Sequence, residues 1–183
     1  MPRIPYPDPA TLPEAVQAML GSAPLRVVRM ASHASPAAFL AQSRLSQAIA
    51  DPEALDARIR ETAILRVAHL SYSAYVLKQH LSLARKAGLS SEEIEAIGAQ
   101  HYNNLEPVLA ATARFTDEIV RNISPSDEAL AALRSHVSDQ ALVNISLAVG
   151  HYMSIIRLIA LAGISPDEQA LTSIAAQAAS VSS

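Results

Sequence analysis

Residues 53–89 read EALDARIRETAILRVAHLSYSAYVLKQHLSLARKAGL, and the predicted architecture is built outward from them. The first half predicts a central helix over residues 53–70, because apolar residues recur there at near-helical spacing: Leu55, Ile59, Ala63, Val67 and Leu70. Ser73 can cap a second helix, and Gly88 is a suitable C-terminal stop for it. Two helices joined by so short a break are expected to form a tight antiparallel hairpin.

Capping residues, prolines and glycines divide the rest of the chain into further helices. The expected ranges are residues 12–20, 24–31, 35–51, 90–97, 105–121, 126–137 and 138–163, with a last helix starting at 165 and a polar joint at 101–104. No stretch alternates with period two over the length of a typical strand. The sequence therefore predicts an all-α protein with a single domain over residues 1–183, in which residues 1–10 form an extended arm and residues 180–183 a frayed tail.

Composition limits the partners that this chain is expected to have. The 183 residues are 50% hydrophobic and 17% charged, with a formal net charge of -3, which argues against nucleic acid as a partner. Asn144, His151 and Arg157 interrupt the apolar stretch over residues 141–162, so we expect a buried helix there and no membrane partner. The first residues lack the pattern of a signal peptide, which predicts a cytoplasmic protein.

The sequence contains no cysteine. Within these residues this excludes disulfides, thiolate zinc sites, iron–sulfur clusters and a cysteine nucleophile. No pair of residues has the His-x-x-x-His or Glu-x-x-His spacing that places two ligands on one helical face. The sequence therefore predicts no metal site.

Glu61 and His80 are the candidate catalytic residues of the hairpin. They are 19 positions apart, one on each predicted helix, and antiparallel packing across a short turn can bring them together. A carboxylate beside an imidazole handles protons well, because the acid orients the ring and the ring titrates near neutrality. The alternative from spacing alone is a solvated ion pair.

Three segments together resemble the carboxymuconolactone decarboxylase family, which shares its all-helical fold with the alkylhydroperoxidase D-type (AhpD) proteins. They are RETAILRVA at residues 60–68, YVLKQH at residues 75–80 and ARKAGLSSEEI at residues 84–94. The segments at residues 33–36 and 142–152 also look like that family's flanking pieces. The resemblance implies an AhpD-like helical bundle with a central helix hairpin.

The peroxidase branch of that family has a Glu, then a Cys-x-x-Cys pair, then a His. Laid on this chain, the pattern places the Glu at Glu61 and the His at His80, while the cysteine positions fall on Ser73 and Val76. Because a thiolate is the group that attacks a peroxide, thiol peroxidase activity is excluded. A cysteine-free peroxidase that uses another reductant stays open as a minor alternative.

Many thiol-free members look like Tyr-Glu-Trp-x-x-His at the start of the second helix. This chain matches at Tyr75 and His80 but has Val76 and Leu77 in place of the Glu and Trp. The departure removes one carboxylate from the pocket that the resemblance implies. Glu61, His80 and Tyr75 are left as polar members of an otherwise apolar pocket.

The resemblance implies a lyase that decarboxylates a small acidic lactone or carbonyl compound, in the catabolism of aromatic compounds, without a metal or organic cofactor. His80 is the expected proton donor, Glu61 its partner, and Arg66 or Lys78 the cation for a substrate carboxylate. The other candidate substrate-binding residues are Tyr75, Ser73, His33, His151 and Tyr152. Simpler alternatives are a helix cap for Ser73, a surface or capping residue for His33 and a core residue for His151.

A second hypothesis is a non-catalytic member of the same fold that binds small molecules or serves as an oligomeric scaffold. Members of the family are commonly homo-oligomers, so the resemblance implies a dimer, trimer or hexamer. The half-apolar, alanine-rich composition is consistent with extra helix surface buried between subunits.

Overall fold

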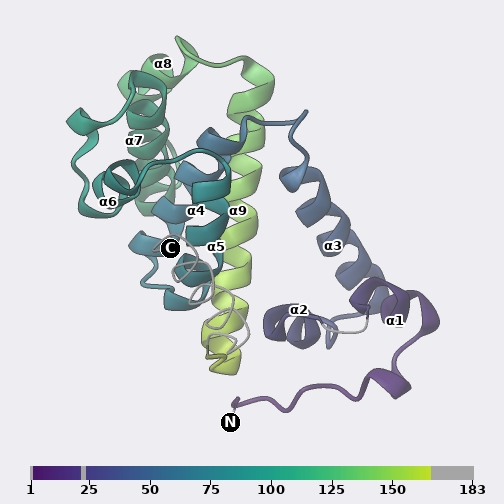
Figure 1. Cartoon of the computed structure of the whole chain (residues 1–183). Coiled ribbons are helices and arrows are strands. Elements are labelled where there is room, and N and C mark those ends of the chain that lie inside the picture. The colour runs from purple at the N-terminus through teal and green to yellow at the C-terminus, as the bar shows by residue number, and fades with distance from the viewer. Residues whose placement is uncertain (1, 22–23, 166–183) are drawn as a thin grey trace.

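The structure is a computed structural model that describes residues 2–21 and 24–165 (Figure 1). Over these residues the chain forms nine α-helices, two short 3-10 helices and no strand, which confirms the all-α prediction. The helices are α1 (Glu14–Leu20), α2 (Arg26–Ala31), α3 (Pro36–Ala50), α4 (Ala57–Leu70), α5 (Ala74–Lys86), α6 (Ser91–Ala99), α7 (Pro107–Asn122), α8 (Asp127–Arg134) and α9 (Asp139–Ala162). The 3-10 helices are η1 (Pro9–Thr11) and η2 (Tyr102–Asn104).

The predicted hairpin consists of α4 and α5, with α4 at the centre of the bundle. Helix α4 packs against α5, α6, α7 and α9, so almost its whole circumference is buried. It begins at Ala57 rather than at the predicted residue 53, because the Asp56 side chain accepts hydrogen bonds from the backbone N–H groups of Arg58 and Ile59. Leu55 is buried just before the helix, which explains why the apolar pattern extended the prediction too far.

Helix α9 is the longest element and runs beside α4 through the length of the bundle (Figure 1). By length and composition alone it could cross a membrane. In this fold it instead packs against α2, α3, α4, α7 and α8, and the Asn144 amide donates to the Ala54 carbonyl oxygen at 2.7 Å. Intramolecular packing therefore buries one side of this helix, while Val143, Leu147 and Leu161 on its other side stay exposed.

Capping chemistry places most helix starts where the sequence predicted them. Ser73, Ser90 and Ser138 accept from backbone N–H groups in the first turns of α5, α6 and α9, and Ser90 forms a full capping box with Glu93. Pro36 follows the Ser35 cap of α3. These contacts are local, so the sequence alone was sufficient to find them.

Several predicted boundaries were wrong by a few residues. Helices α1, α2 and α7 begin later than predicted, at Glu14, Arg26 and Pro107, and α8 ends earlier, at Arg134. The polar joint at 101–104 contains η2. The helix expected from residue 165 and the tail at 180–183 lie outside the described residues.

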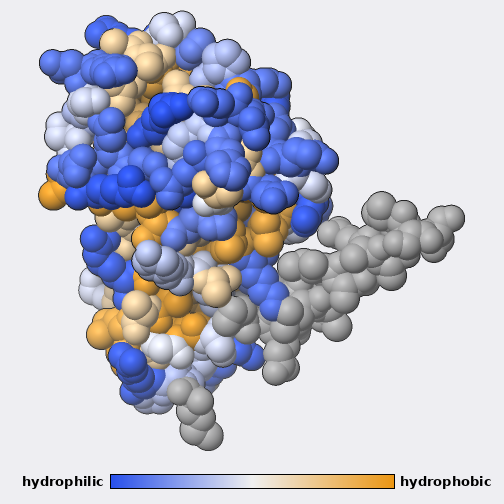
Figure 2. Space-filling model, turned by 90° about the vertical axis from the view of Figure 1, so that its left-hand side faces the viewer, coloured by the Kyte–Doolittle hydropathy of each residue, from blue (hydrophilic) through white to orange (hydrophobic). Residues whose placement is uncertain are grey.

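The surface of the bundle is unevenly polar. On the face shown in Figure 2, hydrophilic residues cover the upper half, at the height of α6, α7 and α8. Hydrophobic residues gather lower, at the height of α5 and the C-terminal half of α9. The described part of the chain thus leaves apolar surface uncovered on its lower half.

Candidate active site

The hairpin brings Glu61 and His80 into direct contact. Glu61 Oε2 lies 2.7 Å from His80 Nδ1, and the two residues are 2% and 8% exposed. Because a carboxylate can only accept, His80 Nδ1 donates this hydrogen bond, which orients the ring and leaves Nε2 as the reactive nitrogen. The pair is buried, so the alternative of a solvated ion pair does not describe it.

Arg60 is the cation next to this pair. Its Nε lies 3.3 Å from Glu61 Oε1, and its Nη1 donates to the Ala50 carbonyl oxygen at 3.2 Å. The Arg60 side chain is 14% exposed, so its positive charge is only partly screened by solvent. The carboxylate thus has a cation on one oxygen and an imidazole on the other.

Tyr152 of α9 covers the imidazole of His80. The two ring centroids are 4.8 Å apart in an edge-to-face arrangement with an interplanar angle of 89°. Burial and the nearby negative charge of Glu61 raise the pKa of Tyr152 well above its usual range. The phenol is therefore neutral at physiological pH and keeps its proton as a hydrogen-bond donor.

A second imidazole, that of His151, also contacts Tyr152. The His151 and Tyr152 rings meet edge to face at 5.5 Å, and His151 Nε2 lies 2.6 Å from the Ser46 hydroxyl of α3. Burial lowers the pKa of His151, which favours the neutral ring. Ser46 was missed in the sequence analysis, because it is 105 residues from His151 and carries no local signal.

The structure places Arg66 away from this cluster, which corrects its predicted role as a carboxylate clamp. Arg66 follows Glu61 by five residues, and at about 100° per residue this turns it to another side of α4. Arg66 is 1% exposed, and its guanidinium forms an ion pair with Asp117 of α7 and donates to the Ile97 carbonyl oxygen. A cation held in this way is not available to a substrate beside His80.

Two other predicted substrate-binding residues have structural roles here. The Ser73 hydroxyl accepts from the backbone N–H of Val76 as the cap of α5. His33 is exposed, and its Nε2 lies 2.7 Å from the Pro5 carbonyl oxygen, where it ties the N-terminal arm to the bundle. Tyr75, the remaining candidate, is buried in the main core on α5.

None of the cavities described below is lined by Glu61 or His80. A small cavity of about 50 Å³ between α2, α3 and α9 is lined by Ser46 together with apolar residues such as Phe39 and Leu158. A groove of about 800 Å³ between α7, α8 and α9 contains none of the cluster's side chains. In the described part of the chain, no three His, Asp or Glu side chains come together as a set of metal ligands.

The fold and the buried Glu–His pair define an all-helical protein of the AhpD-like class. Residues 36–118, from α3 into α7, match the model of the carboxymuconolactone decarboxylase family. This segment belongs to that family, and the match confirms the resemblance predicted from residues 60–94. A search of the curated proteins gave no match.

Solved structures show the same fold at low sequence identity. An alkylhydroperoxidase AhpD core, a peroxidase-related protein from Ralstonia eutropha JMP134, is 16% identical with a TM-score of 0.78, over 92% of this chain and 94% of that one. A protein of unknown function from Agrobacterium tumefaciens is 23% identical with a TM-score of 0.66, over 74% of this chain and 94% of that one.

The debrominase Bmp8 is another structure of this fold. It was solved as a cysteine-to-alanine variant with 2,3,4-tribromopyrrole, and it is 12% identical with a TM-score of 0.69, over 87% of both chains. Proteins of this fold are thus described both as peroxidase-related and as a debrominase. The fold alone does not select one reaction.

Proposed function

We propose that the protein is a cofactor-free enzyme of the carboxymuconolactone decarboxylase type, acting by proton transfer on a small acidic lactone or carbonyl compound. The observation that carries this proposal is the buried contact of 2.7 Å between Glu61 Oε2 and His80 Nδ1. Burying a carboxylate and an imidazole costs free energy unless the two groups pair. A buried pair of this kind is suited to proton transfer, because its two groups can share and exchange a proton.

In the proposed step, the bond between the substrate carbon and its carboxylate breaks, and its electron pair moves onto the carbon conjugated with the carbonyl. Carbon dioxide leaves, and protonated His80 delivers the Nε2 proton to that carbon. Glu61 stabilises the imidazolium before transfer and orients the ring afterwards. Solvent returns the proton to His80, so the cycle needs no oxidant or reductant.

In this proposal Arg60, rather than Arg66, is the cation that attracts a substrate carboxylate. It is the cation in contact with Glu61, and its side chain is partly accessible. A substrate carboxylate placed near Arg60 would meet positive charge, whereas the apolar surroundings of His80 favour loss of a poorly solvated carboxylate. Tyr152 adds a neutral phenol that can donate to a carbonyl oxygen as negative charge develops there.

Thiol chemistry does not enter this proposal, even though similar folds are peroxidase-related. The positions that resemble the cysteine pair carry Ser73 and Val76, and the 183 residues contain no cysteine. Ser73 is also engaged as the cap of α5. A hydroxyl in that place cannot follow the oxidation and resolution steps of a thiolate.

The test is carbon dioxide release from 4-carboxymuconolactone by the purified protein, followed from pH 5 to 9. We expect turnover that falls at least 100-fold in Glu61→Gln and in His80→Ala, with unchanged helix content by circular dichroism. Arg66→Lys serves as a control, because its site is separate from the pair. Turnover that survives Glu61→Gln would exclude the mechanism. A folded protein that turns over no acidic lactone would favour the non-catalytic hypothesis.

A further inference from the structure

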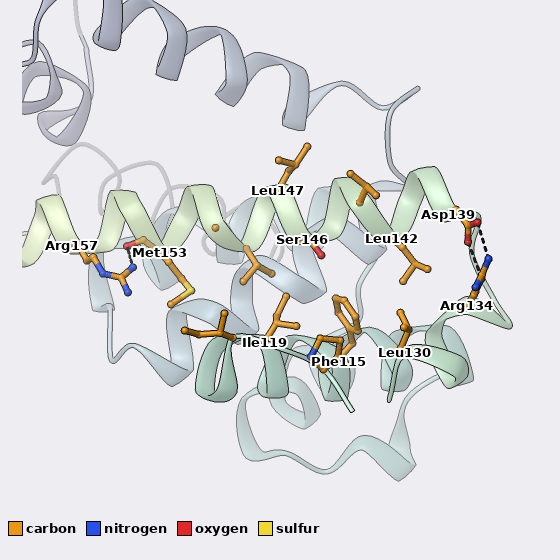
Figure 3. Close-up of a pocket in the computed structure, with 15 residues that line it drawn as sticks. Phe115, Ile119, Leu130, Arg134, Asp139, Leu142, Ser146, Leu147, Met153 and Arg157 are labelled. Atoms are coloured by element: carbon orange, nitrogen blue, oxygen red, sulfur yellow. Dashed lines mark hydrogen bonds and ion pairs between the residues drawn. The ribbon is translucent and has the colours of Figure 1, made fainter. Parts of the chain in front are cut away.

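The groove of about 800 Å³ between α7, α8 and α9 has no part in the proposed reaction, because neither Glu61 nor His80 lines it. Its walls are apolar. Phe115, Ile119 and Leu130 line the side formed by α7 and α8, and Met153 projects toward them from α9 (Figure 3). A concave apolar surface of this volume lies within the range of pockets that bind small molecules.

Two positions along the groove keep it open and apolar. Gly150 of α9 lines it, and a Cβ atom placed there would meet nothing within 4 Å. Ile123, another lining residue, is 90% exposed with a φ of +69°, a conformation that a β-branched residue rarely adopts. An apolar side chain held in a strained and exposed position beside an apolar groove is a candidate ligand contact.

Among the described residues that line the groove, Arg157 alone brings a charge that nothing neutralises. The other two charged lining residues, Arg134 and Asp139, pair with each other at 2.8 Å at the opposite end (Figure 3). Arg157 has no acidic partner in the described part of the chain, and its guanidinium donates to the Met153 carbonyl oxygen at 3.0 Å. It lies before the last turn of α9, so compensation of the helix dipole does not explain it.

We propose that this groove binds a medium-chain fatty acid, with the carboxylate on Arg157 and the alkyl chain along α9 toward Leu142. A guanidinium has five N–H donors and matches a carboxylate in a bidentate arrangement. From Arg157 to Leu142 the helix surface extends about 22 Å, at about 1.5 Å per residue, which gives an extended alkyl chain room to lie flat.

The lining residues favour this class of ligand over more polar ones. Ser146 is the one uncharged polar side chain among the described lining residues. A sugar or a nucleotide would therefore leave most of its hydrogen-bonding groups without partners, which costs free energy. A cationic amphiphile would meet the positive charge of Arg157. An acid with an apolar chain matches both the walls and the charged end.

Isothermal titration calorimetry of the full chain tests the proposal with decanoate, decanol and decyltrimethylammonium, each below its critical micelle concentration. We expect decanoate to bind about tenfold more tightly than decanol, because a hydrogen bond to a charged group is stronger than one to a neutral group. The ammonium compound should bind most weakly. From octanoate to dodecanoate, affinity should rise by about two- to fourfold for each added methylene, since an open groove buries only part of each one.

Two pairs of variants locate the binding site. Arg157→Gln should lower the affinity for decanoate about tenfold and leave that for decanol unchanged, whereas Arg85→Gln, at an exposed residue of α5, is the matched control. Gly150→Leu should fill the groove and abolish binding of both compounds, while circular dichroism shows an intact helix, because leucine has the higher helix propensity. Ser154→Leu, exposed on α9 but not lining the groove, should bind as the wild type does.

Three results would overturn the proposal. Equal affinities for decanoate and decanol, unchanged by Arg157→Gln, would make the groove an apolar surface without selectivity for acids. Binding that survives Gly150→Leu would place the ligand elsewhere on the molecule. A wild type that binds none of the three compounds would mean that the groove is covered by something other than a small acid. All three readouts are independent of turnover, so they do not depend on the reaction proposed for Glu61 and His80.

Discussion

Helix α4 carries two buried ionic clusters whose surroundings differ. At Arg66, the guanidinium pairs with Asp117 and donates to backbone carbonyls, and the Tyr102 hydroxyl donates to the second Asp117 oxygen at 2.8 Å. At Glu61, the carboxylate contacts His80 and Arg60, while no described residue forms a hydrogen bond with His80 Nε2. We call the first cluster closed because its charged groups pair within the protein. The second, the open cluster, leaves His80 Nε2 without a hydrogen-bond partner among the described residues.

In the closed cluster, the Tyr102 phenol keeps its proton. Burial and the adjacent Asp117 raise the pKa of Tyr102 above its usual range, so the phenol remains a donor. The guanidinium, the carboxylate and the phenol of this cluster all bond to groups within the protein, which is typical of a structural network. The comparison teaches that burial of charge alone does not indicate a catalytic site, and that an unused hydrogen-bonding position is the more informative feature.

The largest effect is expected when the open cluster loses its carboxylate. Glu61→Gln keeps the shape of the side chain but removes the charge that stabilises protonated His80, so turnover should fall about 100-fold to 10,000-fold. Initial rates measured beside urea denaturation check this, and the midpoint should move little. If Glu61→Gln lost turnover only because less of the protein was folded, the two clusters would no longer differ in function.

The closed cluster should respond in the opposite way. Asp117→Asn leaves the Arg66 guanidinium buried without its counter-charge, which costs about 3–5 kcal/mol of unfolding free energy. Urea denaturation measures the loss, and turnover per folded molecule should persist. Arg121→Ala is the control, because Arg121 lies 3.8 Å from Asp117 with a 52% exposed side chain and should contribute little.

A smaller effect is expected at the second imidazole. Ser46→Ala removes the hydroxyl that lies 2.6 Å from His151 Nε2, so the ring loses its orientation beside Tyr152. We expect about a tenfold loss of turnover, within the range of a positioning contribution, and about 1 kcal/mol of stability. Ser43→Ala, which lines the same small cavity, is the matched control. An unchanged rate would confine the site to Glu61 and His80.

The smallest effect concerns pH. Burial lowers the pKa of His151 in the fold, so the unfolded chain binds more protons between that lowered pKa and the ordinary histidine pKa of about 6.5. The stabilisation is present above about pH 6.5 and is lost as the pH falls through the folded pKa. Melting temperatures from pH 5 to 7.5 should therefore decline on acidification, less so in His151→Gln. His136→Gln, at an exposed residue, should keep the wild-type slope.

The sequence analysis predicted one half of the candidate site. Glu61 and His80 were found because a short turn between two helices restricts their relative placement, and the structure shows them in contact. Ser46 was not found, and Arg66 was assigned to the wrong surroundings. Both errors concern contacts between residues far apart in the chain, 105 positions for Ser46 with His151 and 51 for Arg66 with Asp117.

The features that the sequence alone predicted depend on interactions between residues close together in the chain. The class of the fold, the hairpin and the serine caps follow from apolar spacing and from side chains that bond to backbone groups a few residues away. The exclusion of thiol chemistry follows from composition. Tertiary packing settled which side of α4 each ionic group faces and which apolar residues of α9 stay exposed. Those outcomes depend on where distant helices dock, and no local spacing contains that information.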